Sequence, residues 1–348
     1  MSIYQRITDA WAVLAHGAKV ARKRKEIPAI TPEEIAEAKA FFPMDKFFIL
    51  GHSRSGNTLL MRLVRLHPEV HANYQATFFA RPPGLTSLVD SSEIAEWLSR
   101  KTNRWNRGRD MSARVLRAAA DFILESDARR AGSSKHIVGD KSPTTVTHGL
   151  AVRQMHKIYP DARMVYIVRD GRDVMVSDRF RNIVEEKFLQ RADVKVIVAL
   201  RENPQAFVSG EKSIFTETWL RGVHQGVPSW RDNLVESETE GQRLFGDHYY
   251  PIRYEDILAD PFAEMKKLWL FLGVKEVDPA LEPALRAEIA DNPDEKWQAE
   301  RNQSIPAILP KGQPGGWRKF FTARDRRVFK EIAGELLVKW GYEKDLNW

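Results

Sequence analysis

The chain has 348 residues, a net charge of +7 and no cysteine, with 43% apolar and 29% charged residues. Disulfides, thiolate metal sites and cysteine nucleophiles are therefore excluded, and a reducing, cytoplasmic location is expected. No apolar run approaches the roughly 18 residues that cross a bilayer, and no zinc-finger, homeodomain or RNA-recognition signature accompanies the basic residues, so we expect a small anionic ligand and no nucleic acid.

Residues 1–46 are expected to form a helical extension ahead of a single domain at residues 47–348. The stretch Thr31-Pro32-Glu33-Glu34 offers a capping residue, a proline at the first helical position and early acidic residues, which together predict a helix start. A basic cluster lies at residues 19–25. We expect this extension to pack on the domain; contact of its basic helix with a membrane surface is the less favoured alternative. The sequence does not indicate an oligomeric state.

Strand and helix patterns alternate along the rest of the chain. Strands are expected at Phe47–Leu50, His136–Gly139, Met164–Val168 and His248–Ile252. Helical patterns lie at residues 59–66, 111–126, 148–158, 174–188, 214–237, 261–272 and 324–340. This alternation predicts an α/β fold of three layers, with a mainly parallel sheet covered by helices on both faces, as in P-loop nucleotide-binding proteins. Residues 290–322 are polar and rich in proline and glycine, so we expect a long loop there.

The first candidate site is the turn after the first strand. Gly51, Gly56 and Thr58 keep the spacing of the nucleotide P-loop motif G-x-x-x-x-G-K-[ST]. Asn57 occupies the lysine position, and Arg54 supplies a cation three residues earlier. Such a strand–turn–helix unit presents backbone N–H groups and a helix N-terminus to a phosphate. The groups that could surround it are the backbone amides of residues 54–58 and the hydroxyls of Ser55 and Thr58. The alternative is an ordinary glycine-containing turn.

The second candidate site follows the most β-branched strand. Arg169 leaves the end of this strand, where ligands bind in open α/β sheets, and Ser177 follows eight residues later. An arginine fork and a hydroxyl can together hold one phosphate. The alternative is an arginine that forms an ion pair with Asp170 or Asp173.

The third candidate site is the late loop Pro310–Thr322. Its glycines, Gly312 among them, allow the backbone to approach a ligand closely, and Lys311 supplies charge. The alternative is a flexible surface loop.

Together, these three segments resemble the nucleotide-binding motifs of the sulfotransferases that use 3′-phosphoadenosine 5′-phosphosulfate (PAPS). The turn is similar to the family's 5′-phosphosulfate loop, the segment 169–177 to its 3′-phosphate motif, and the segment 311–322 to its late loop, R-K-G-x-x-G-x-W-[KR]-x-x-F-T. Tyr254-Glu255-Asp256 resembles the family's Y-E-D, whose tyrosine lies near the adenine. The turn and Gly139-Asp140-Lys141-Ser142-Pro143 are most similar to the tyrosylprotein-type and related bacterial branch.

The resemblance implies a sulfotransferase that moves a sulfuryl group from PAPS to a hydroxyl or amine of a small molecule or peptide, with PAP as product and no metal. It implies that Arg54 and Lys141 stabilise the charge of the leaving phosphate. It also implies that Arg169, Ser177 and Lys311, with Gly312, bind the 3′-phosphate. Sulfuryl transfer, like phosphoryl transfer, then depends mainly on positioning and charge stabilisation.

The general base is the least defined part of the candidate site. In the tyrosylprotein-type branch a glutamate lies 21 residues after the turn arginine, and the corresponding residue here is Gln75, which cannot accept a proton. The remaining candidates are His71 and His148, with Asp140 less favoured. An acceptor amine, or a hydroxyl that is already acidic, would need less help from a base.

Two other functions remain open from the sequence. One is a P-loop kinase, which Asn57 in the lysine position argues against. The other is a non-catalytic protein that binds PAPS or PAP, which Gln75 would allow.

Overall fold

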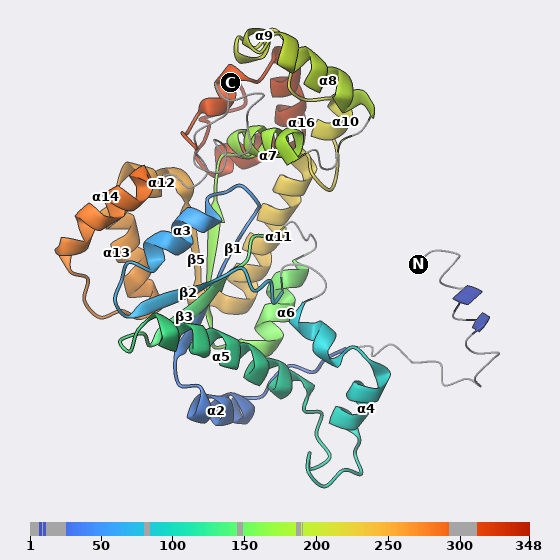
Figure 1. Cartoon of the computed structure of the whole chain (residues 1–348), viewed down its shortest axis with the longest axis vertical. Helices are drawn as coiled ribbons and strands as arrows, with labels where there is room; N and C mark the ends of the chain where they lie inside the picture. Colours follow the sequence, from blue (N-terminus) through green and yellow to red (C-terminus); the bar gives the residue numbers. More distant parts are fainter. Residues whose placement is uncertain are drawn as a thin grey trace.

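The computed structural model describes residues 26–79, 84–144, 149–185, 189, 191–291 and 312–348, together with residues 7, 8, 10 and 11. Its centre is a five-stranded sheet in the order β2-β3-β1-β4-β5 (Figure 1). The strands are β1 Asp45–Gly51, β2 Val70–Tyr74, β3 Ile137–Lys141, β4 Arg163–Val168 and β5 Tyr249–Arg253. All four ladders between neighbouring strands are parallel.

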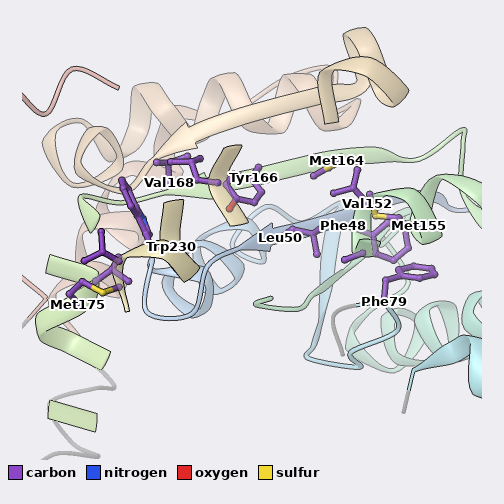
Figure 2. Packing of buried hydrophobic residues seen from close by; sticks show 14 of the residues in the cluster. Phe48, Leu50, Phe79, Val152, Met155, Met164, Tyr166, Val168, Met175 and Trp230 are labelled. Carbon is purple, nitrogen blue, oxygen red and sulfur yellow. The ribbon is translucent and has the colours of Figure 1, made fainter. Parts of the chain in front are cut away.

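The two faces of the sheet form two separate parts of the core, because successive side chains of a strand point to opposite faces. In β1, Phe48 and Leu50 belong to one hydrophobic cluster, and Phe47 and Ile49 belong to the other. Figure 2 shows the first cluster, in which side chains of β1 and β4 meet Val152 and Met155 of α6 (Leu150–Ile158). Burial on both faces accounts for the nearly continuous apolar sequence of these central strands.

Helices cover both faces (Figure 1). The first cluster includes residues of α4 Ser92–Ser99, α5 Ser112–Ala131, α6, α7 Gly171–Glu185, α8 Arg191–Glu202, α9 Gln205–Val208, α10 Glu217–Leu220, α11 Val227–Phe245 and α16 Ala323–Lys339. The second includes residues of α3 Asn57–Val64, α12 Tyr254–Ala259, α13 Pro261–Leu272 and α14 Glu282–Ala290. Short 3₁₀ segments are η1 Leu85–Val89, η2 Gly246–His248, η3 Pro279–Leu281 and η4 Gly316–Lys319. The expected three-layer α/β fold is confirmed.

The helix start predicted at Thr31 is confirmed as the N-cap of α2 Pro32–Phe41. The side chain of Thr31 accepts the backbone N–H of Glu34, and the carboxylate of Glu34 accepts the backbone N–H of Thr31. This reciprocal pair satisfies two of the donors that a helix N-terminus leaves free. Glu37 of α2 forms an ion pair with Arg114 of α5, which links α2 to a helix that covers the sheet.

One expectation about elements was wrong, and one strand was missed. The segment 214–237 is not one helix, because α10 ends at Leu220 and α11 begins at Val227. At Gly226, a Cβ atom would lie 2.3 Å from the carbonyl oxygen of Leu220, so the chain packs too closely there for a continuous helix. Strand β2 was not expected at all, because its apolar positions are separated by His71 and Asn73 and it lies at the sheet edge.

Within the described residues, no helix has both the length and the apolar content that crossing a bilayer requires.

Candidate functional site

The candidate site lies at the carboxyl edge of the sheet, where the chain changes direction. β1 pairs with β3 on one side and with β4 on the other, so the end of β1 is a topological switch point. Gly51 is the last residue of β1, and α3 begins at Asn57. The intervening turn is therefore held between the ends of three parallel strands.

The turn is closed by the residue that replaces the P-loop lysine. The side-chain amide of Asn57 donates to the carbonyl oxygen of His52 at 2.9 Å, and the backbone N–H of Ser55 donates to the same oxygen at 3.2 Å. Arg54 and Gly56 both have positive φ angles, of 69° and 94°. Asn57 thus fixes the backbone of the turn and does not reach out toward a ligand.

Tyr254, the first residue of α12, packs directly against Gly56. A Cβ atom at position 56 would lie 2.4 Å from the Tyr254 ring, so only glycine fits. The Tyr254 hydroxyl donates to the carbonyl oxygen of Gly312 at 2.9 Å. One tyrosine therefore contacts both the turn and the late loop.

Arg54 and Ser177 meet although they are 123 residues apart. The Nε of Arg54 donates to the Ser177 hydroxyl at 2.9 Å. Ser177 lies on α7, which follows β4, so the contact joins the turn to the second candidate segment.

Arg169 connects all three predicted segments. Its Nη1 donates to the carbonyl oxygen of Arg54 at 3.0 Å and its Nη2 donates to that of Gly312 at 3.2 Å. Its guanidinium also lies over the Tyr254 ring, with Cζ 4.6 Å from the ring centroid, a cation–π geometry. The structure brings the three segments to one place.

The two aspartates that could have neutralised Arg169 are engaged elsewhere. Asp170 forms an ion pair with Arg172 at 2.7 Å. Asp173 accepts the backbone N–H groups of Gly315 at 2.7 Å and Trp317 at 2.8 Å. Within the described part of the chain, no carboxylate lies within ion-pair distance of Arg169.

Lys141, the last residue of β3, forms a second cationic position beside the turn. Its Nζ donates to the amide oxygen of Gln75 at 3.2 Å and to the Thr58 hydroxyl at 3.5 Å. It also lies 4.0 Å from the centroid of the Tyr74 ring. The pKa of Lys141 is lowered to about 8, mainly by burial; Asp140 opposes this shift and Arg65 adds to it.

Gln75 lies in a strained corner that follows β2. Gln75 and Thr77 have φ angles of 60° and 56°, which non-glycine residues rarely adopt. Asp140 accepts the backbone N–H of Ala76 at 2.8 Å, and the Ser142 hydroxyl accepts that of Thr77 at 3.0 Å. Asp140, a less favoured candidate for the base, therefore supports the corner that positions Gln75; burial raises its pKa.

Of the two histidine candidates for the general base, the structure describes only His71. The ring Nε2 of His71 lies 2.7 Å from a carboxylate oxygen of Asp127 on α5, and burial lowers the pKa of His71. Among the described residues, His71 makes no contact with the turn. His148 lies outside the described residues, as does Lys311.

Two acidic residues of the site were missed by sequence reasoning. Asp173 was read only as a partner for Arg169, yet it ties the late loop to α7. Asp178 follows Ser177, and burial raises its pKa to about 6 although Arg54 and Arg181 oppose the shift. Its position next to Ser177 was the only available signal.

The donor set fits an anion. Arg54, Arg169 and Lys141 surround the turn, and two buried donors there, Ser55 Oγ and Arg169 Nε, have no hydrogen-bond partner among the described residues. An unpaired buried donor is costly and is normally satisfied by a ligand or water. No group of three potential metal ligands occurs in the described ranges.

Comparison with known proteins identifies relatives of this chain. The model of the sulfotransferase family matches residues 46–279. The omega-hydroxy-beta-dihydromenaquinone-9 sulfotransferase Stf3 of Mycobacterium bovis is 24% identical over 327 residues, which cover 90% of this chain and 67% of Stf3. The protein-tyrosine sulfotransferase of Drosophila melanogaster is 24% identical over 240 residues, or 68% of this chain and 40% of that protein.

Solved structures give a weaker likeness. Retinol dehydratase in complex with androsterone and PAP aligns over 95% of this chain and 94% of its own, with a TM-score of 0.47 and 16% identity. A mouse sulfotransferase complexed with PAP aligns over 88% and 90%, with a TM-score of 0.44 and 15% identity.

Proposed function

The chain belongs to the sulfotransferase family and is a PAPS-dependent enzyme, and on that premise we propose that PAPS binds at the turn Gly51–Thr58 and that its sulfuryl group passes to an acceptor hydroxyl. The observation that carries this proposal is the position of Arg169. Its guanidinium bridges the carbonyl oxygens of Arg54 and Gly312, which gathers three distant segments around one cationic centre. Burial of unpaired donors at the same place supports an anionic ligand.

The residues divide according to the part of PAPS that each would contact. Arg54, Lys141 and Thr58 would face the 5′-phosphosulfate together with the N-terminus of α3. Arg169 and Ser177, with Lys311 and the Gly312 backbone, would hold the 3′-phosphate. Tyr254 would lie against the adenine, and the remaining contacts would come from Ser55, Gly56 and Asn57 through the turn backbone.

PAPS supplies the sulfuryl group and a phosphate leaving group. The bond between sulfur and the 5′-phosphate oxygen breaks, a bond from sulfur to the acceptor oxygen forms, and the acceptor proton is lost. Arg54 and Lys141 would stabilise the negative charge that develops on the leaving phosphate oxygen, and such preorganised charge lowers the barrier because it needs no rearrangement during the reaction.

The acceptor is proposed to be a hydroxyl, because the names of two relatives specify one: an omega-hydroxy menaquinone for Stf3 and a protein tyrosine for the Drosophila enzyme. The general base is proposed to be His148, since the contacts of His71 in the described residues are with Asp127 of α5 and not with the turn. Alanine at position 148 should reduce turnover with an unactivated alcohol far more than alanine at position 71. Equal effects would contradict this assignment.

Binding of PAP in the absence of magnesium tests the proposal. A ligand at 100 times its dissociation constant raises the free energy of unfolding by about 2.7 kcal/mol, which a thermal melt detects easily. PAP should stabilise the protein more than adenosine 5′-phosphate does, and Arg169→Ala should remove that difference. Stabilisation by ATP with magnesium but not by PAP would instead indicate the P-loop kinase.

Transfer of label from [³⁵S]PAPS across a panel of hydroxyl and amine acceptors separates an enzyme from a non-catalytic PAP-binding protein. Arg54→Ala is the control variant, because it should lower transfer and retain PAP binding.

We further propose that residues 47–348 act as one domain, preceded by the helical extension at residues 1–46. Residues of β1 and of the late helix α16 belong to the same hydrophobic cluster, which supports a single domain. A cytoplasmic location is proposed from the cysteine-free composition.

A further inference from the structure

The loop that joins α4 to α5 exposes two tryptophans side by side. Trp97 is 57% exposed near the end of α4, and Trp105 is 50% exposed in the following loop. Their ring centroids are 5.0 Å apart. Figure 1 shows α4 at the periphery, away from the sheet. Large exposed aromatic side chains that form a pair mark an interaction surface more often than a scattered single one does.

Basic residues surround this pair. Residues 97–109 contain five basic and no acidic residues: Arg100, Lys101, Arg104, Arg107 and Arg109. All five are exposed. Arg100 pairs with Glu96 at 2.8 Å, whereas Lys101, Arg104 and Arg107 form no ion pair with any residue that the structure describes. The segment therefore offers unneutralised positive charge beside apolar rings.

The loop is held in this shape by its own hydrogen bonds. The buried side chain of Asn106 donates to the carbonyl oxygens of Leu98 at 3.2 Å and Arg100 at 3.1 Å, and accepts the backbone N–H of Gly108 at 2.9 Å. Asn103 donates to the carbonyl oxygen of Trp97 at 3.0 Å. Because these hydrogen bonds fix the backbone around both tryptophans, the fold itself keeps the two side chains exposed.

We propose that the tryptophan–arginine loop, residues 97–109, docks the protein on the surface of an anionic lipid bilayer. Indole rings are favourable at the level of lipid headgroups, because they pair an apolar body with one polar N–H. Basic side chains beside them are attracted to acidic headgroups. The combination of exposed apolar rings and unpaired cations matches both requirements of an interfacial anchor.

Aliphatic neighbours favour a bilayer over a nucleic acid. Ile94 is exposed on the same side of α4 as Trp97, three residues earlier, and Leu88 is exposed in the adjacent η1. Aromatic and arginine side chains can stack on bases, but aliphatic side chains gain little there. In a bilayer they add buried apolar area. This proposal does not depend on the sulfotransferase reaction.

Co-sedimentation of the full chain with lipid vesicles tests the proposal. One set of vesicles contains phosphatidylcholine alone, and the other contains phosphatidylcholine with 30% phosphatidylglycerol, a composition chosen to be anionic. We expect binding to the anionic vesicles at low salt and weaker binding at high salt, because screening shortens the reach of the charges. Trp97→Ala/Trp105→Ala should weaken binding at least tenfold, and Arg104→Ala/Arg107→Ala should remove the preference for anionic lipid.

The control removes the same charge from another part of the surface. Lys266→Ala/Lys275→Ala alters two exposed lysines in and just after α13 and should bind vesicles like the unmodified protein. The thermal unfolding midpoint of every variant, compared with that of the unmodified protein, reports whether it is folded. Retained docking in both loop variants would overturn the proposal. Absence of vesicle binding, or tighter binding of a single-stranded oligonucleotide by the same residues, would also overturn it.

Discussion

Position 57 illustrates how single residues shape the site. In a nucleotide P-loop this position carries the lysine that reaches the phosphates. Here Asn57 instead closes the turn by its hydrogen bond to the His52 carbonyl, while Arg54 and Lys141 bring charge from two other backbone positions. The backbone role and the charge role, combined in one lysine elsewhere, are therefore separated in this chain.

Arg54→Ala should reduce turnover by about 10²–10³-fold, because it removes one preorganised cation from the developing charge. PAP should still bind with less than a tenfold loss, since Arg169 and the turn amides remain. Single-turnover transfer from labelled PAPS, with PAP binding by calorimetry, measures both quantities. Arg62→Ala on the outer side of α3 is the matched control. Unreduced turnover in Arg54→Ala would remove Arg54 from catalysis.

Lys141 should set the alkaline limit of activity. Its pKa of about 8 means that it carries its charge below that pH and loses it above, so kcat/KM should fall as pH rises through about 8. Bound PAPS is anionic and favours the protonated form of Lys141. The fall of kcat at alkaline pH should therefore occur at a higher pH than the fall of kcat/KM. Lys141→Arg should move both limbs upward. An unchanged profile in that variant would exclude Lys141 as the titrating group.

The lowered pKa of Lys141 also affects how the stability of the protein depends on pH. Between about 8 and the ordinary value of 10.5, Lys141 binds fewer protons in the folded than in the unfolded state, so its contribution makes the free energy of unfolding rise with pH in that window.

The sequence predicted the charged residues of the site better than their partners. Arg54, Arg169 and Ser177 belong to short local motifs, so their meeting could be inferred. The contact of Lys141 with Gln75 and the support of that corner by Asp140 could not, because they depend on the register of β2 against β3. The pairing of His71 with Asp127 likewise depends on how α5 lies beside β2.

Among the elements, α12 and the late loop close the site around the turn. Tyr254 begins α12 and contacts Gly56, Arg169 and Gly312. Asp173 in the first turn of α7 holds the late loop by two backbone N–H groups. The geometry of the candidate site thus depends on where α7 and α12 begin.

Gly56→Ala should abolish PAP binding and destabilise the protein, because the methyl group adds a clash with Tyr254 to the strain of a positive φ. Gly246→Ala is the matched control: its φ of 50° is also positive, but no atom lies within 4 Å of the added Cβ. Its cost should be limited to the backbone strain, on the order of 1–3 kcal/mol. Equal losses of stability and unchanged PAP binding in both would contradict the close packing.

Asp173→Ala should weaken PAP binding through the late loop, since the N–H groups of Gly315 and Trp317 lose their acceptor. Asp260→Ala provides the comparison, because Asp260 also accepts a backbone N–H, at the start of α13. Loss of that cap should cost about 1 kcal/mol of stability and leave PAP affinity unchanged. The dissociation constant of PAP and the denaturant midpoint distinguish the two effects.

Element boundaries show where sequence patterns mislead. Helix α2 was predicted because its capping box is local. The break between α10 and α11 was missed because the close approach of Gly226 to Leu220 is a matter of packing, and β2 was missed because a short edge strand with polar residues has little pattern.

For the whole molecule, the order β2-β3-β1-β4-β5 explains why the three candidate segments could be expected to meet from the sequence alone. Parallel strands end at one edge, so residues that follow different strands converge there whatever their separation along the chain. The fold class followed from the alternation of strands and helices, whereas the order of the strands needed the three-dimensional structure.

The central position of β1 gives a distinctive hydrogen–deuterium exchange pattern. β1 has a hydrogen-bonded neighbour on each side, and only its first residue is exposed, so its amides should exchange only by the rarest, largest opening of the molecule. The turn begins one residue beyond it and includes amides that a ligand would cover. Without PAP, residues 46–51 should therefore exchange far more slowly than residues 54–58, and PAP should bring the exchange of residues 54–58 toward that of the strand, a change that mass spectrometry of short peptides would resolve. Slow exchange of the turn without PAP would contradict this picture of an immobile strand that carries an open binding turn.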